Sequence, residues 1–477
     1  MGFLTRLRSH VTCRRDHPSV VTATRSLSYG ALLELVEAGR RDLSQRGVGP
    51  GAVVGVLLRD EVEHLVASLA LLASGAAHVT LASHDPAPVR TALSKRVHVT
   101  HVLIAEPHPS VEGVTSVRWD ELTLGQTPAA QETTLDAEGM LYLKTSGTTG
   151  DTNIVPFSQT QIGAQAGRHE EYRDERLLRL ASIEHNNSKR HRLYCVWAGG
   201  TNVFKPTTAF DIVDFCTRYA VTCMDISRMH VADLAANPEA QGLAGIKLRT
   251  GGSAVPGHAR RQIEERVTRR LYVRYGATEC GAISMAGPNQ HDADDPVGVP
   301  CAGVEVEIVG RSVPARVGET GEIRVRAPGM ATGYLDSPDD TAKRFRDGWF
   351  HPGDLGILRS DGQLVVLGRT DDMILLNGVN IFPAEIEQVL ESHVGVNAAA
   401  ALPLPSAVHG QIPVAAVELR SGSDVAPAEL LRYAREHLSL RAPRRILVMD
   451  QLPRNGQGKI MRCELVRVFR AGTTPHD

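Results

Sequence analysis

The chain has 477 residues, more than one compact hydrophobic core usually organises, so we expect two or three subdomains. Its composition, with 42% hydrophobic and 22% charged residues, is typical of a globular enzyme. The formal net charge is only -2, which gives no general attraction to polyanions. We therefore expect neither nucleic acid nor an anionic membrane surface as the main partner.

The cysteine and apolar patterns indicate a cytoplasmic protein. Seven cysteines are scattered without a CxxC pair, which predicts reduced thiols rather than a disulfide framework or a zinc site. The N-terminal segment carries arginines but no apolar core of signal-peptide length. The longest apolar stretch, residues 65–73, is about half as long as a bilayer crossing requires. We expect a buried helix there and no membrane partner.

The first part of the chain alternates helical and strand patterns. Apolar residues recur at helical spacing over residues 32–43 and again over 62–74. Short apolar runs at 53–58, 78–81 and 140–144 predict buried strands. This alternation indicates a mostly parallel sheet with helices on its faces.

The polar, irregular stretch 107–136 predicts a surface connection before the strand at 140–144. Beyond residue 300, the alternating runs VEVEIV, EIRVRA and QLVVLG, separated by glycine-containing turns, indicate small antiparallel sheets. After the GRTDD turn, helices over Pro383–Ser392 and 426–438 alternate with strands.

We therefore predict an α/β protein in two parts. A large N-terminal body of mostly parallel sheets with flanking helices, plus a small antiparallel β region, covers residues 1–368. A hinge at 369–372 leads to a small, mobile α+β C-terminal domain, residues 373–477, whose size is usual for a domain.

A loop rich in serine, threonine and glycine follows the predicted strand at 140–144. Backbone N–H groups of such a loop surround an anion and the hydroxyls add hydrogen-bond donors, so phosphate is the predicted ligand. A mobile turn is the alternative. The loop is not a nucleotide P-loop, because Asp151 follows its last glycine. Its residues are Thr145, Ser146, Gly147, Thr148, Thr149 and Gly150.

The order of motifs resembles the acyl-adenylate-forming (AMP-binding) superfamily of acyl- and aryl-CoA synthetases, luciferases and peptide-synthetase adenylation domains. The motifs run nearly end to end as LSY, ASGAAHVTL, TSGTTG, YGATE, GEI, GDL, GRTDD and PRNGQGK. The resemblance implies an ATP-dependent ligase that uses Mg²⁺ to join an acid to AMP and then passes the acyl group to a second acceptor. The body would bind ATP and the acid.

The resemblance also implies a nucleotide site. Asp354 is expected to accept both ribose hydroxyls, as a bidentate carboxylate is able to do, and Arg369 to contact ribose and phosphate. Thr278 is expected to bind the α-phosphate and Glu279 to hold Mg²⁺. The predicted adenine slot comprises Gly251, Gly252, Ser253, Tyr275, Gly276 and Ala277. Taken alone, Asp354 would be interpreted as part of a salt bridge, Tyr275 as a core residue, and the Thr278 and Glu279 pair as surface.

Three further roles belong to the C-terminal part. By resemblance, the ammonium of Lys459 stabilises charge on the phosphoryl and bridging oxygens during adenylation. Asp371 is the expected hinge about which the lid rotates between half-reactions. Gly378 resembles the glycine past which a pantetheine arm reaches the adenylate. Without the resemblance, Lys459 would be read as a solvated lysine and GRTDD as a polar turn.

Two segments depart from the family pattern. Where relatives place Pro-Lys-Gly after the phosphate loop, this chain has Thr152, Asn153 and Ile154, so one cation is missing and we expect weaker ATP binding or slower pyrophosphate departure. The run IEHNNSKRHR at 183–192 stands where relatives have an apolar or aromatic wall.

The basic run leaves two interpretations open. His185 and Asn186 resemble the His-Asn pair by which aryl-acid-activating members contact a hydroxylated ring. If these residues line the pocket with Lys189 and Arg190, the acid is small and polar or carries a second negative group, because buried cations need a partner. Alternatively, the run is a solvated basic loop.

The leading prediction is adenylation of a small polar or aryl carboxylic acid, with transfer to coenzyme A or to a carrier protein supplied in trans. A second possibility is another adenylating ligase, such as an amide-forming enzyme or a nitrite-activating diazotase that acts on an aryl amine. A third is a catalytically weak nucleotide-binding regulatory protein, against which the retention of Lys459, Glu279, Asp354 and Arg369 argues.

Overall fold

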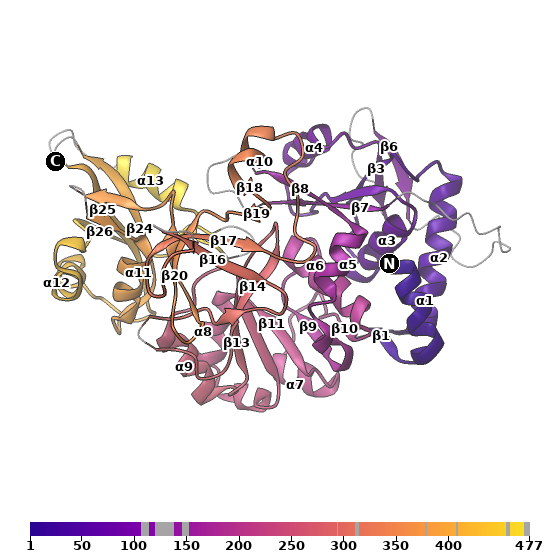
Figure 1. Ribbon diagram of the computed structural model, residues 1–477. Helices are drawn as coiled ribbons and strands as arrows, with labels where there is room; N and C mark the ends of the chain where they lie inside the picture. The colour runs from indigo at the N-terminus through magenta and orange to yellow at the C-terminus, as the bar shows by residue number, and fades with distance from the viewer. Residues whose placement is uncertain are drawn as a thin grey trace.

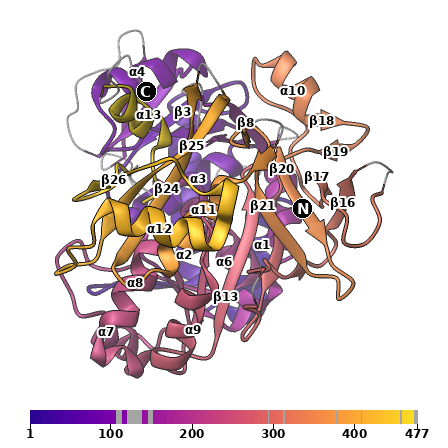
Figure 2. The ribbon, with the colours of Figure 1, turned by 90° about the vertical axis from the view of Figure 1, so that its left-hand side faces the viewer.

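The computed structural model describes residues 1–105, 114–119, 138–145, 152–292, 294–310, 314–376, 379–406, 409–454 and 458–471 (Figure 1). Its sheets form a large body, and a smaller C-terminal group of elements lies at one side of that body (Figures 1 and 2). The predicted α/β class is confirmed, with parallel sheets in the body and antiparallel sheets after residue 300.

The largest sheet has the order β15-β14-β13-β12-β11-β9-β10-β1-β2, and its central neighbours from β1 to β13 are parallel. Its strands are β1 Pro18–Val21, β2 Ser26–Ser28, β9 Arg176–Arg179, β10 Thr201–Val203, β11 Cys223–Ile226, β12 Lys247–Gly251, β13 Leu271–Ala277, β14 Gly281–Ala286 and β15 Val299–Pro300. One face packs through Leu178, Met224 and Leu248 against apolar residues of α7 Ile212–Arg218, α8 Arg228–Ala236 and α9 Gly257–Arg266.

A second sheet has the order β6-β5-β3-β4-β7-β8. Its strands are β3 Val53–Leu57, β4 Ala77–Thr80, β5 His101–Ile104, β6 Thr115–Arg118, β7 Met140–Lys144 and β8 Ile154–Ser158. Its helices are α2 Tyr29–Gln45, α3 Glu61–Ala73, α4 Ala87–Arg96, α5 Gln159–Ala166 and α6 Asn186–Ala198. The predicted helices and strands of this region are therefore confirmed.

The apolar stretch at residues 65–73 lies in α3, where the core of the body covers it. Helix α3 begins at the cap Asp60, whose carboxylate accepts hydrogen bonds from the backbone N–H groups of Val62 and Glu63 at 2.9 Å each. From Leu65 to Leu72 its side chains are buried in the body core. In the described part of the chain, no helix is both long and apolar enough to cross a bilayer.

Among the elements that the sequence analysis did not predict are α1 and β6, which lie in segments that it had interpreted otherwise. The arginine-bearing N-terminal segment forms α1 Phe3–Arg14, which buries Phe3 and Leu7. Strand β6 lies inside the stretch expected to be an irregular connection, so that expectation is wrong at 115–118. Strand β6 alternates little and pairs only at the edge of the sheet, which explains the weak sequence signal.

The antiparallel elements follow residue 300, as predicted. Strands β16 Glu305–Val309, β17 Gly321–Arg326, β18 Phe345–Arg346, β19 Trp349–Phe350, β20 Asp354–Leu358 and β21 Leu364–Arg369 form one sheet, accompanied by α10 Pro338–Arg344. The C-terminal sheet contains β22 Ile374–Leu376, β23 Val379–Ile381, β24 Val396–Ser406, β25 Gly410–Leu419 and β26 Arg445–Met449. Its helices are α11 Pro383–Ser392, α12 Pro427–Leu438 and α13 Arg462–Ala471.

Short 3-10 helices complete the described elements at η1 Glu170–Asp174, η2 Pro238–Leu243 and η3 Ser439–Arg441. All seven cysteines are free thiols, as the scattered spacing predicts. The C-terminal elements touch the body directly: Gln388 of α11 donates a hydrogen bond to Asp295 at 2.7 Å, and Glu391 of α11 pairs with Arg228 of α8.

Candidate active site

The predicted adenine walls lie at the carboxyl ends of two neighbouring parallel strands. Gly251 ends β12 and Ala277 ends β13, and the two strands pair with Gly251 opposite Arg274. A Cβ at Gly251 would lie 2.5 Å from the Arg274 carbonyl oxygen, so the strand ends approach too closely for a larger residue. Gly252 has a φ of 86°, which glycine adopts without strain. Ligands of α/β sheets commonly bind at this edge.

The carboxylate of Asp354 joins three parts of the body. Tyr275 donates its hydroxyl to Oδ2 of Asp354, and Nη1 of Arg369 donates to Oδ1 at 3.4 Å. Asp354 and Arg369 face each other in the β20–β21 ladder, which fixes their spacing. Burial, and then the neighbouring Asp354 carboxylate, raise the pKa of Tyr275, so its hydroxyl stays a donor. The three predicted nucleotide residues therefore meet at one edge.

Glu279 lies next to this edge, in the turn between β13 and β14. It is buried, and burial raises its pKa, while a hydrogen bond of 2.7 Å from the Tyr334 hydroxyl opposes the rise. Mg²⁺ is often held by one or two carboxylates together with phosphate oxygens. The single buried carboxylate of Glu279 therefore fits a Mg²⁺ that arrives with a nucleotide.

Lys459 approaches the same edge from the C-terminal elements. It precedes α13 and is partly buried, and burial lowers its pKa. The charges of Arg462 and Arg369 lower this pKa further, whereas Asp372 and Asp354 raise it. Asp354 belongs to the body and Arg369 begins the predicted hinge, so Lys459 lies within electrostatic reach of the predicted ribose site.

The predicted hinge contains a small ionic cluster. The Asp371 carboxylate pairs with Arg344 at 3.1 Å and with Arg369 at 3.3 Å. The backbone N–H of Thr370 donates to the Gly353 carbonyl oxygen at 2.8 Å. These contacts hold the segment between body and C-terminal elements in the orientation seen here.

Two family models match this chain. That of the AMP-binding enzyme covers residues 7–335, and that of the AMP-binding enzyme C-terminal domain covers residues 385–459. The chain belongs to the AMP-binding enzyme family. The predicted resemblance is therefore confirmed.

Curated relatives of this AMP-binding family member include CoA ligases. It is 38% identical over 202 residues to the 2-succinylbenzoate–CoA ligase of Geobacillus kaustophilus, covering 42% of this chain and 41% of that protein. It is 35% identical over 244 residues to a feruloyl-CoA synthase of Amycolatopsis, covering 50% and 49%. The matched region covers less than half of the length of each of these two relatives.

Solved structures share the fold along nearly the whole chain. The o-succinylbenzoate CoA synthetase of Bacillus subtilis, in complex with an acyl-adenylate, superposes with a TM-score of 0.84 at 25% identity, covering 96% of this chain and 97% of that one. MatB of Rhodopseudomonas palustris gives a TM-score of 0.88 at 22% identity, with coverage of 98% and 99%, and shows the fold alone.

The phosphate loop of this AMP-binding family member is seen only at its two ends. The Thr145 N–H donates to the Asn153 carbonyl at 2.8 Å, and the Asn153 N–H donates to the Thr145 hydroxyl at 3.1 Å. At the position where a lysine was expected, the Asn153 amide donates to Asp340 at 2.9 Å. Six predicted site residues lie outside the described residues, namely Ser146, Gly147, Thr148, Thr149, Gly150 and Gly378.

The basic run forms a buried helix, so the solvated-loop interpretation is wrong. Helix α6 begins after His185 and buries Lys189 and Arg190 between the two large sheets. The sequence of a short charged run does not show whether tertiary structure will bury it. The apolar LYCVWA sequence that follows is typical of a core helix.

The four predicted pocket residues of α6 point in different directions. Arg190 donates to the Thr278 carbonyl at 2.7 Å and so contacts the nucleotide motif. Asn186 donates to the Lys144 carbonyl, and the His185 ring lies 5.4 Å from that of His84. Lys189 is fully buried and acts electrostatically on His64 and His78 in the core. Their roles in substrate binding stay predictions.

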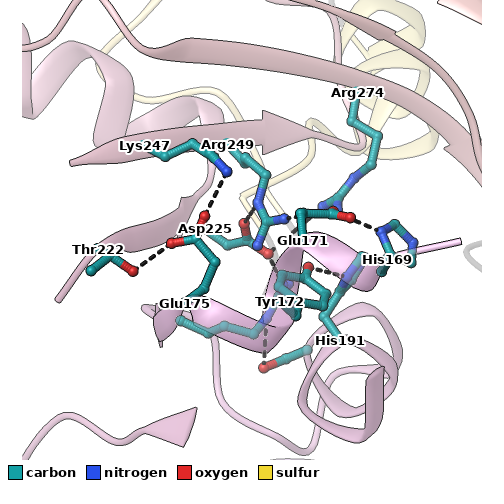
Figure 3. Close-up of polar contacts among 12 residues, drawn as sticks. His169, Glu171, Tyr172, Glu175, His191, Thr222, Asp225, Lys247, Arg249 and Arg274 are labelled. Atoms are coloured by element: carbon teal, nitrogen blue, oxygen red, sulfur yellow. Dashed lines mark hydrogen bonds and ion pairs between the residues drawn. The ribbon is translucent and has the colours of Figure 1, made fainter. Parts of the chain in front are cut away.

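Sequence reasoning missed a buried ionic cluster on the face of the large sheet that is turned toward α6 and η1 (Figure 3). Asp225 of β11 pairs with Arg179 of β9, with Arg249 of β12 at 2.8 Å and with Arg274 of β13 at 3.9 Å. A signal was present, because buried parallel strands are normally continuous apolar runs and each of these strands carries a charge.

Proposed function

We propose that this protein is an ATP-dependent, AMP-forming ligase that adenylates a small polar or aryl carboxylic acid and transfers the acyl group to coenzyme A or a carrier-protein thiol. The observation that carries the proposal is that Lys459, from the C-terminal elements, lies within electrostatic reach of Asp354 and Arg369. In the proposed division, residues 1–368 bind ATP and acid, 369–372 form the hinge and 373–477 form the lid.

The proposed first half-reaction is an in-line displacement at the α-phosphorus. A carboxylate oxygen of the acid forms a bond to phosphorus, the bond to the bridging oxygen breaks, and pyrophosphate leaves. The Lys459 ammonium and the Thr278 hydroxyl would stabilise the charge that develops on the phosphoryl oxygens. Glu279 would hold Mg²⁺, which neutralises phosphate charge.

The proposed substrate class rests on the size of the body cavity and on the relatives. A cavity of about 290 Å³ lies beside β12 to β15, and this volume is at the small end of the range for organic ligands. Two relatives are named for aryl acids, 2-succinylbenzoate and ferulate, and both are named for coenzyme A. A cytoplasmic location is supported by the free thiols.

ATP–pyrophosphate exchange against a panel of acids tests the proposal. The panel contains hydroxybenzoates, aminobenzoates, dicarboxylates and nitrite. Exchange with at least one carboxylic acid supports the ligase. Exchange with nitrite alone, or tight ATP binding without any exchange, contradicts it and favours the diazotase or the regulatory protein.

Replacing the lid lysine tests the mechanism. Lys459→Ala should slow adenylate formation by about two to four orders of magnitude, because the transition-state charge loses its cation, while a chemically prepared adenylate still reacts with its acceptor. Lys343→Ala, at an exposed lysine of α10, is the control and should change neither rate. Equal loss of both half-reactions in Lys459→Ala would contradict the lid role.

A further inference from the structure

The cavity of about 290 Å³ opens between the large sheet and the segment around η1. Its lining includes Arg168, His169 and Glu171 on one side and Arg249, Ala282 and Cys301 on the other. Ala282 pairs with Gly276 in the β13–β14 ladder, so the cavity begins next to the proposed adenine wall. It therefore lies where the acid would continue away from the nucleotide.

Strand geometry places two arginines directly beneath the glycines of the nucleotide site. Side chains alternate along a strand, so Arg249 lies on the same face as Gly251, and Arg274 on the same face as Gly276. The glycines present no side chain on that face. Of these two arginines, Arg249 lines the cavity.

The donors of this arginine cluster are incompletely satisfied. Among the described residues, buried nitrogens without a hydrogen-bond partner include Nη2 of Arg249, Nη1 of Arg274 and Nε of Arg168. Arg249 and Arg274 are 2% and 9% exposed. A buried donor without a partner is costly, so a nearly closed set of such donors indicates a ligand that accepts hydrogen bonds.

The charge around the cavity is also unbalanced. In the described structure, five cations (Arg168, Arg179, Lys247, Arg249 and Arg274) stand near three carboxylates (Glu171, Glu175 and Asp225). Lys247 pairs with Glu175, and Asp225 is shared by three arginines. The remaining lining carboxylate, Glu171, lies 3.6 Å from Arg249 and also accepts a hydrogen bond from His169 at 3.2 Å.

The two histidines of the cluster do not add fixed positive charge. Burial lowers the pKa of His169 and of His191. The hydrogen bond and the charge of Glu171 oppose this effect at His169, whereas the surrounding arginines lower the pKa of both histidines further. The His191 ring shares a hydrogen bond of 2.7 Å with the Tyr172 hydroxyl, and the Arg249 guanidinium stacks 4.3 Å from the Tyr172 ring centre. In the described structure, Arg249 faces Asp225 at 2.8 Å and Glu171 at 3.6 Å, whereas Arg274 faces Asp225 at 3.9 Å, so Arg274 is the less compensated of the two cations.

We propose that this cavity is an anion subsite of the acid pocket, in which Arg249, supported by Arg274 and Arg168, binds a second carboxylate of the acid. The substrate is then a compact dicarboxylic acid. This inference rests on the proposed function, because it assumes that the first carboxylate is adenylated above the glycines.

The strand spacing gives the expected separation of the two carboxylates. Two residues along a strand span about 7 Å, so the level of Arg249 lies about that far below the level of Gly251. One aromatic ring or a short chain bridges this distance, and a guanidinium binds a carboxylate in bidentate geometry. A neutral group at the same place would leave the arginine donors unpaired.

Matched diacids and monoamides test the subsite. Phthalate, terephthalate and a carboxyphenylpropanoate are each compared with the analogue in which the distal carboxylate is a carboxamide of nearly equal size. In ATP–pyrophosphate exchange, kcat/KM for the best diacid should exceed that for its monoamide by about tenfold or more. In Arg249→Gln and in Arg168→Gln, this ratio should fall about tenfold.

Two variants are needed because Arg249 also pairs with Asp225. In the described structure the hydrogen bonds of Arg168 go to the carbonyl oxygens of Cys280 and Ala282, so its replacement should disturb the fold less. Arg270→Gln, at an exposed arginine that precedes β13, is the control and should keep the wild-type ratio. A monoamide used as well as its diacid, or a ratio unchanged in both cavity variants, overturns the subsite and leaves the proposed function intact.

Calorimetric measurement of diacid binding in the absence of ATP distinguishes failure of the proposed ligase function from failure of the anion subsite. If no acid supports exchange, the proposed function fails. In that case, tighter diacid binding to the wild-type protein than to Arg168→Gln, by about tenfold, still supports the subsite, and equal binding overturns it.

Discussion

Lys189 shows how a single side chain of α6 differs from its neighbours. Arg190 and Arg192 of the same helix have hydrogen-bond acceptors, whereas Nζ of Lys189 has none among the described residues. Burial lowers the pKa of Lys189 to about 7, and the charge of Glu184 only partly offsets this effect. The lysine therefore destabilises the fold whenever it is protonated.

The effect on stability should depend on pH in a defined direction. The folded-state pKa of about 7 lies below the ordinary value of 10.5, so the cost is complete below about pH 7 and is relieved as the pH rises toward 10.5. Lys189→Met should stabilise the protein by about 1–4 kcal/mol at neutral and lower pH, and by less at about pH 9. Urea unfolding of both proteins at several pH values measures this difference.

Lys343→Met is the matched control, because Lys343 is exposed and its replacement should change stability little at any pH. A stability difference for Lys189→Met that does not vary with pH would contradict the buried-cation account. The same variant also tests substrate binding. An unchanged KM for the acid would show that Lys189 does not contribute to the predicted pocket.

At the level of elements, α1 is joined to the far end of α6. Nε of Arg6 donates to the Trp197 carbonyl at 2.8 Å, and the rings of Phe3 and Trp197 lie 5.1 Å apart at 70°. Leu7 has no exposed surface. The helix that covers the predicted acid pocket thus depends on residues at the start of the chain.

Truncating Leu7 should measure the contribution of this contact. Leu7→Ala should lower the free energy of unfolding by about 2–5 kcal/mol, because a buried leucine leaves a cavity. Arg8→Ala, also on α1, removes an exposed ion pair of 3.0 Å with Glu37 of α2 and should cost less than about 1 kcal/mol. Similar losses in both variants, measured by urea denaturation, would show that α1 does not pack as described.

Elements with strong local patterns could be predicted from the sequence, whereas those defined by tertiary contacts could not. Helix α11 has the predicted bounds Pro383–Ser392, and the VEVEIV run became β16 within one residue. Helix α1 was missed because its three arginines hide the narrow apolar stripe of Phe3 and Leu7. The motif order identified the strand ends around Gly251 and Tyr275, but the pairing of Asp225 with three arginines depends on strand order, which no local pattern contains.

At the scale of the whole molecule, the C-terminal elements are attached by a few polar contacts. Glu391 of α11 is 4% exposed, and it pairs with Arg228 of the body and accepts a hydrogen bond from the Ala399 N–H at 3.1 Å. Burial raises the pKa of Glu391, and the Arg228 charge opposes this rise. Removing the arginine therefore leaves a buried carboxylate without its cation.

Arg228→Ala should loosen the C-terminal elements selectively. We expect a loss of about 1–3 kcal/mol from the closed arrangement, seen as faster amide hydrogen exchange in α11 and faster proteolysis near residues 369–372. Arg326→Ala, which removes an exposed pair of 3.4 Å with Glu305, serves as the control. If exchange in α11 rises equally in both variants, the Arg228 contact does not hold the C-terminal elements in place.

The distribution of thiols has a practical consequence for testing the proposed rotation of the C-terminal elements. Cys13 of α1 and Cys463 of α13 are exposed, Cys301 is partly covered, and the other four cysteines are buried. Maleimide dyes should therefore react first at one position in the body and one in the C-terminal part, without any engineered cysteine. Energy transfer between the two dyes, recorded on single molecules, would report whether ATP, an acid or coenzyme A changes the separation of the two parts.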